Sequence, residues 1–103
     1  MNATEALAIV QDEPADKFIT DVNEDLEGRH CTFGLLVENS YHVKQLVGKV
    51  TAFNIKVKEF TLIKAGEDLS IVDINDHPHP PYNEPVIKDR MIHLFTDMVA
   101  AGY

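Results

Sequence analysis

Residues 76–85 read Asp-His-Pro-His-Pro-Pro-Tyr-Asn-Glu-Pro and hold four of the five prolines of the chain. Proline lacks a backbone N–H and its ring clashes with the preceding helical turn, so this stretch cannot form a helix interior or a central strand. We expect a rigid, extended connector. A final helix follows, with Asn83 as its cap and one apolar stripe at helical spacing. The stripe consists of Ile87, Met91, Leu94, Phe95 and Met98.

Two helices are predicted before residue 30. Asn2 is a good cap for the first helix, and Glu5 three positions later completes a capping-box pattern. Pro14 suits the first turn of a second helix, and Gly28 is a typical stop signal. The apolar residues of this second helix fall at helical spacing. They are Phe18, Ile19, Val22 and Leu26.

The middle of the chain favours strands. Residues 31–37 form a short apolar run, and residues 69–74 would return after a turn at 64–67. Between them, apolar side chains alternate with polar ones, a period of two that is typical of a half-buried strand. The alternating residues are Phe53, Asn54, Ile55, Lys56, Val57 and Lys58. We therefore predict an α+β fold in a single domain, residues 1–103: two N-terminal helices, a small antiparallel sheet from residues 31–74 and a C-terminal helix packed on it.

A long central helix is the alternative for residues 33–64. Seven apolar residues there fit a heptad spacing, which would give an all-α dimer. The many β-branched residues and Gly48 disfavour a continuous helix, so the sheet is preferred. The heptad residues are Leu36, Val43, Leu46, Val50, Phe53, Val57 and Phe60.

The charge of the chain limits its partners. The formal net charge is -8, which disfavours direct binding of nucleic acid or of anionic membranes. A protein partner remains, including a nucleic-acid-binding protein whose groove an acidic chain can occupy. Cys31 is the only cysteine, which fits a reducing compartment. No apolar run is long enough for a membrane span and residues 1–10 do not resemble a signal peptide, so we expect a cytoplasmic protein.

Acidic and basic residues are segregated. Residues 1–40 carry nine acids and two bases, whereas residues 41–64 carry five lysines and one glutamate. The acidic residues of the predicted helix around Asp16 to Glu27 could imitate a row of phosphates, although a solvated helix face is the commoner explanation. Lysines on an exposed strand protect its edge or bind an acidic partner. The candidate partner-binding residues are Asp16, Asp21, Glu24, Asp25, Lys56 and Lys58.

His77 and His79 flank Pro78 and could share a metal ion, with Asp73, Asp76 or Cys31 completing the ligand set. Only a pair of ligands is evident, and a polar loop held by proline is the commoner meaning of such a pattern. No other cofactor is expected.

On the final helix, His93 lies four residues from Asp89 and from Asp97. A carboxylate-flanked imidazole can act as a base, but no nucleophile is identifiable nearby, so a surface row of paired side chains is preferred. No phosphate-binding loop, nucleophile elbow or zinc-protease motif is present.

Three short steps in the C-terminal third are Val72-Asp73, Tyr82-Asn83-Glu84 and Gly102-Tyr103. They resemble a group of small tailed-phage proteins of unknown function, in which a β-hairpin leads through a Tyr-Asp/Asn-Glu step into a final helix that ends near Gly-Tyr. The resemblance covers about a third of the chain. The stretch 77–81 is inserted relative to that pattern. The resemblance implies a viral accessory protein and no activity.

These observations predict a small, acidic, non-enzymatic accessory that binds another protein, such as a viral inhibitor of a host factor in the host cytoplasm. A homo-oligomer is also expected, because a chain of this size leaves much surface to bury. One alternative is a small-ligand or metal-dependent binder or hydrolase that uses His77 and His79. A second is a structural self-assembling protein, which the heptad residues favour.

Overall fold

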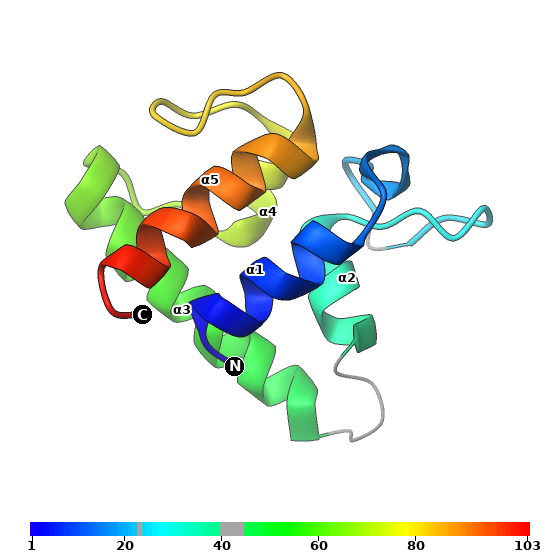
Figure 1. Cartoon of the computed structure of the whole chain (residues 1–103), viewed down its shortest axis with the longest axis horizontal. Helices are drawn as coiled ribbons and strands as arrows, with labels where there is room; N and C mark the ends of the chain where they lie inside the picture. The colour runs from blue at the N-terminus through cyan, green and yellow to red at the C-terminus, as the bar shows by residue number, and fades with distance from the viewer. Residues whose placement is uncertain (23, 40–44) are drawn as a thin grey trace.

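Helices make up the regular structure of this computed structural model, which describes residues 1–22, 24–39 and 45–103. The described residues form five α-helices, whose arrangement Figure 1 shows. In chain order the elements are α1 (Ala3–Asp12), the 3-10 helix η1 (Ala15–Lys17), α2 (Thr32–Asn39), α3 (Gln45–Ala65), α4 (Ile71–Asp76) and α5 (Ile87–Ala100).

The predicted antiparallel sheet is wrong. The described residues contain only isolated bridges, and the segments expected to be strands lie in α2, α3 and α4. In α3, Phe53 and Val57 are buried while Ile55 between them is 55% exposed. Side chains four apart share one face of a helix, whereas a strand would have put all three on one face. The burial pattern of the fold thus overrides the weak β preference of this segment.

The returning strand predicted for residues 69–74 is the helix α4. Ser70 caps it: the Ser70 Oγ accepts from the backbone N of Asp73 at 3.1 Å, and the Asp73 carboxylate accepts from the backbone N of Ser70 at 2.9 Å. This reciprocal pair satisfies two donors that a helix start leaves open. The Ser-x-x-Asp step was present in the sequence as a helix signal.

The long-helix alternative describes residues 45–65 better than the sheet does. The apolar face of α3 nevertheless packs within the chain, because Val50, Phe53, Val57 and Phe60 belong to the hydrophobic core. Leu36 lies in the separate helix α2, and Val43 lies outside the described residues. The heptad residues of α3 from Val50 to Phe60 are therefore not a free dimer seam.

The N-terminal cap is confirmed. Asn2 Oδ1 accepts from the backbone N of Glu5 at 2.9 Å, and α1 follows. The second predicted helix is wrong, because only the turn η1 forms after Pro14. Gly28 instead lies in a turn, with a φ of 73° that disfavours other residues. A helix over 14–28 would have buried Leu26, which is fully exposed.

The proline connector contains no helix between α4 and α5, as predicted, although Asp76 belongs to α4. The final helix begins at Ile87 rather than just after Asn83, and no side chain caps it. Its predicted apolar stripe is confirmed. Met91, Leu94, Phe95 and Met98 are fully buried and Ile87 packs against them.

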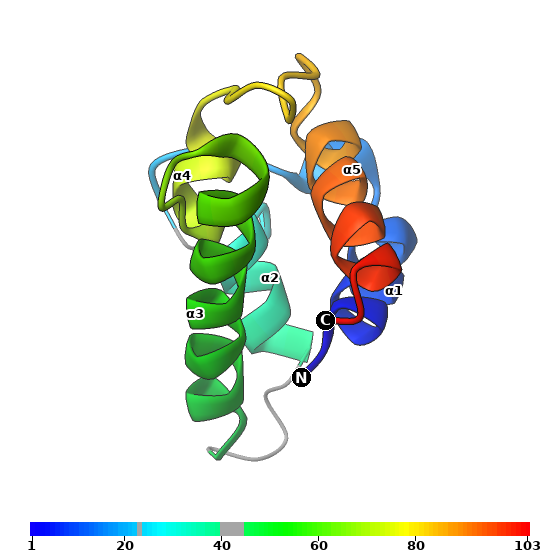
Figure 2. The ribbon, with the colours of Figure 1, turned by 90° about the vertical axis from the view of Figure 1, so that its left-hand side faces the viewer.

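Two layers enclose the core. Figure 2 shows α1 beside α5 on one side of the molecule and α3 with α4 on the other. Phe53 of α3 contacts Phe95 of α5 across them, with ring centroids 5.7 Å apart. The chain ends meet, since the backbone N of Ala3 donates to the carbonyl of Tyr103 at 3.2 Å. One face of α3 packs in the core, and the opposite face is exposed to solvent.

Candidate functional site

The outward side of α3 is the candidate interaction surface. We call it the outer face of α3 and define it by Gly48, Ala52, Ile55, Lys56, Lys58, Glu59, Leu62 and Ile63, all exposed. Gly48, Ala52, Ile55, Glu59 and Leu62 recur every three or four residues and so form one stripe along the helix. Ile55 and Leu62 are each 55% exposed and Ile63 is 80% exposed. Small and apolar side chains at this spacing are typical of a helix that receives another helix.

Lysines flank that stripe. Glu59 is the one acid on α3, and its Oε2 lies 3.4 Å from the Nζ of Lys56. Lys49 and Lys58 lie on either side of the stripe, are exposed and form no ion pair within the described residues, whereas Lys64 lies near Phe60 and Asp97. The chain carries 17 acidic residues against nine basic ones, so exposed lysines that form no ion pair in the described residues contrast with its average surface. The outer face of α3 is therefore both apolar and basic.

The four predicted acidic partner-binding residues do not share a helix face, because the segment after η1 is irregular. Asp16 and Asp21 are exposed, and the backbone N of Asp21 donates to Asp76. Asp25 is occupied by Arg29, whose Nη2 lies 2.6 Å from its carboxylate. Burial acts to raise the pKa of Asp25, but hydrogen bonds from Arg29 and from the Glu27 backbone lower it overall. The predicted phosphate-like row is absent from this segment.

The predicted metal pair gains no third ligand. His77 is exposed, and the Nδ1 of His79 lies 3.6 Å from the Oε2 of Glu67. Neither Asp73, Asp76 nor Cys31 joins them in a ligand group in the described part of the chain. Burial raises the pKa of the Cys31 thiol, which disfavours the thiolate that a metal needs.

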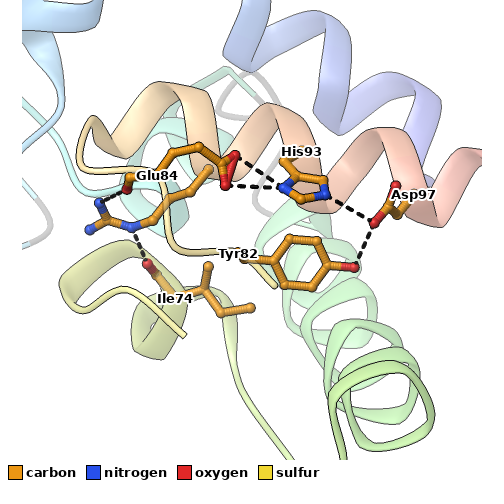
Figure 3. A network of polar contacts seen from close by, with 6 residues as sticks. Ile74, Tyr82, Glu84, His93 and Asp97 are labelled. Carbon is orange, nitrogen blue, oxygen red and sulfur yellow. Dashed lines mark hydrogen bonds and ion pairs between the residues drawn. The ribbon is translucent and has the colours of Figure 1, made fainter. Parts of the chain in front are cut away.

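The imidazole of His93 lies in a network between the connector and α5 (Figure 3). Its Nδ1 is 3.0 Å from both carboxylate oxygens of Glu84, and its Nε2 is 3.4 Å from Asp97 Oδ2. The hydroxyl of Tyr82 donates to the same Asp97 oxygen at 3.0 Å. The sequence predicted a carboxylate-flanked imidazole with Asp97 but missed Glu84, because the connector folds back onto the helix. Asp89 is exposed and does not join this network.

This network braces the connector against α5. Burial, together with the hydrogen bond to Asp97, raises the pKa of the Tyr82 phenol far above its usual value, so the hydroxyl stays protonated. Both nitrogens of His93 face carboxylates, Nδ1 that of Glu84 and Nε2 that of Asp97. The geometry holds the connector against α5.

Sequence reasoning also missed a group of three potential metal ligands. Glu24, His30 and Glu38 converge in the folded chain, and they are the one such group in the described residues. No sequence pattern could have shown it, because the ligands come from an irregular segment, a bridge residue and the end of α2.

No family model, no curated protein and no solved structure matches this chain. No helix within the described ranges is both long enough and apolar enough to cross a membrane. The resemblance to small tailed-phage proteins stays a prediction. The functional argument therefore rests on the surface of this molecule alone.

Proposed function

We propose that this chain is a non-enzymatic accessory that binds a partner protein through the outer face of α3. The proposal rests on two features of the same helix. Ile55 and Leu62 are exposed, and the lysines beside them, Lys49 and Lys58, form no ion pair within the described residues. An isolated exposed apolar residue needs no explanation, but Ile55, Leu62 and Ile63 exposed on one helix, beside the small residues Gly48 and Ala52, favour a binding surface.

The partner chemistry follows from the charges. Lys49, Lys56 and Lys58 flank the stripe, so the complementary occupant is an amphipathic helix with acidic residues beside its apolar stripe. Gly48 has open space where a Cβ would stand, and Ala52 is small, so a partner helix can approach closely at that end. Self-pairing through this face would oppose like charges, which disfavours a second copy as its occupant.

A nucleic-acid-binding host protein is the other partner class expected from the net charge. It would contact the carboxylates of residues 16–25 rather than α3. Because these carboxylates do not line up on one helix, and Asp25 is already paired with Arg29, the lysine side is the stronger candidate. Inhibition of a host factor in the cytoplasm remains part of this proposal.

A designed amphipathic helix of the length of α3 provides a defined probe. One version carries glutamates beside its leucine stripe, and its matched control carries lysines there. We expect the glutamate version alone to bind in isothermal titration, with an affinity that falls as salt is added. Equal binding of both versions, or of neither, would overturn the proposed surface.

Variants locate the binding. Ile55→Glu should abolish it and Lys58→Glu should weaken it, whereas Leu26→Glu, which alters an exposed leucine in the irregular segment, should not. Light scattering on the pure chain tests the homo-oligomer. A dimer that Ile55→Glu converts to monomer would assign the outer face of α3 to a second copy and contradict the acidic partner.

A further inference from the structure

Three side chains that can ligate a metal meet beside α2, away from the outer face of α3. Glu24 comes from the irregular segment before α2, His30 lies two residues before its start, and Glu38 is in its last turn. One ligand atom from each residue lies within 4.8 Å of the other two. The closest contact joins His30 Nδ1 and Glu38 Oε2 at 3.0 Å.

The backbone of His30 is held in place before any ion binds, and its imidazole contacts Glu38. Its backbone N donates to the carbonyl of Lys17 at 2.8 Å, and its carbonyl accepts from the backbone N of Ile19 at 2.8 Å. The side chain is only 8% exposed. A buried, fixed imidazole loses little entropy when it becomes a ligand, so the site is partly organised in advance.

The two carboxylates lack a permanent positive partner. Glu24 and Glu38 form no ion pair with lysine or arginine within the described residues, and nearby Arg29 pairs with Asp25 and Glu27 instead. The imidazole of His30 contacts Glu38, and the carboxylates of Glu24 and Glu38 are exposed, so a cation can reach both from solvent. A divalent cation among the three side chains would compensate both carboxylates.

We propose that Glu24, His30 and Glu38 bind a divalent transition metal ion of the Zn²⁺ type. Imidazole nitrogen with carboxylate oxygen suits Zn²⁺ or Mn²⁺, whereas Mg²⁺ and Ca²⁺ favour oxygen ligands alone. Metal–ligand bonds of ~2.1 Å place neighbouring ligand atoms roughly 3.0–3.5 Å apart. The distance of 3.0 Å between His30 Nδ1 and Glu38 Oε2 therefore fits two ligands of one ion. Water completes the coordination.

The bound ion joins the irregular segment to α2. The described residues between 18 and 30 contain no helix, and the bridges from His30 to Phe18 and to Glu24 lie within this segment. The segment contacts α4 through hydrogen bonds from Asp21 N to Asp76 and from Asn75 Nδ2 to the carbonyl of Ile19. Metal binding adds a cross-link from Glu24 to Glu38 and should protect this segment from proteolysis. This inference is independent of the partner proposed for α3.

Isothermal titration of ZnCl₂ into the metal-stripped full chain tests the site. We expect one strong site per chain. Glu24→Gln and Glu38→Gln should each weaken binding about tenfold or more, because they remove a ligand. The matched control is the double variant His77→Ala/His79→Ala, which removes the exposed histidine pair and should retain the strong site.

A second measurement uses wild type only and therefore does not depend on whether the variants fold. In wild type, the ¹⁵N resonances of the His30 imidazole should shift on addition of Zn²⁺, and MgCl₂ should cause no such change. Three results would overturn the site: no stoichiometric Zn²⁺ binding, binding that Glu24→Gln and Glu38→Gln leave intact, or binding that disappears in the His77/His79 double variant. His30 is not substituted in this test, because its side chain is buried and its replacement would disturb the fold.

Discussion

The Nε of Arg90 donates to the carbonyl oxygen of Ile74 at 2.7 Å, which ties the first turns of α5 to the last turn of α4. The same guanidinium also donates to the carbonyls of Asn75, Glu84 and Pro85. Arg90 is 3% exposed, and burial lowers its pKa. A cation at the C-terminal end of α4 satisfies carbonyls that the helix leaves open.

We expect Arg90→Met to lower the free energy of unfolding by about 3 kcal/mol, because several buried carbonyls lose their donor. Urea unfolding followed by circular dichroism measures this. Arg29→Met is the control, since it removes an arginine at the surface and should have a much smaller effect. Equal destabilisation by both variants would show that Arg90 does not brace α4.

The burial of Val57 and Ile55 distinguishes the helix from the predicted strand. In a strand both would share a face, but in α3 Val57 is fully buried and Ile55 is largely exposed. Val57→Ala should destabilise the fold by about 2 kcal/mol, whereas Ile55→Ala should change it by less than about 0.5 kcal/mol. Similar losses for both substitutions in urea unfolding would contradict the helical register.

The cap of α4 should be measurable. Replacing Ser70 with alanine removes the oxygen that accepts from Asp73 N and should destabilise the fold by about 1 kcal/mol. Ser70→Gly should lose less, because glycine is itself tolerated at a helix cap. Thermal unfolding checks the order. If Ser70→Ala matches wild type, the capping box does not stabilise α4.

Glu84 gives the fold a dependence on acid pH. Partial burial acts to raise its pKa, but hydrogen bonds from His93 and the backbone lower the pKa overall. A carboxyl group whose pKa is lower in the folded chain stabilises the fold above its unfolded pKa of about 4.3, and this contribution is lost as the pH falls through the folded value.

Wild type should therefore exceed Glu84→Gln in melting temperature at pH 6, and the difference should shrink below about pH 4. Thermal melts across this pH range measure it. Asp89→Asn, which removes an exposed carboxylate from the same helix, controls for the change in net charge. A difference between wild type and Glu84→Gln that stays constant down to pH 3 is incompatible with the Glu84–His93 contact as a source of stability.

Some of the candidate surface could be predicted from the sequence. Lys56 and Lys58 were identified from the local excess of lysine, which does not depend on secondary structure. Ile55 was assigned to a buried strand face, so its place among the exposed residues of α3 was missed. The ligands Glu24, His30 and Glu38 were not grouped at all, because the predicted second helix would have separated them.

The sequence by itself determined the parts whose signals are local. The Asn2 cap of α1, the proline stretch and the apolar stripe of α5 depend on side chains within a few residues of each other. Residues 49–63 carry both a period-two and a helical pattern, and local propensities differ too little to decide between them. Only the tertiary structure decided, because α3 buries Val50, Phe53, Val57 and Phe60 together as a helix and a strand could not.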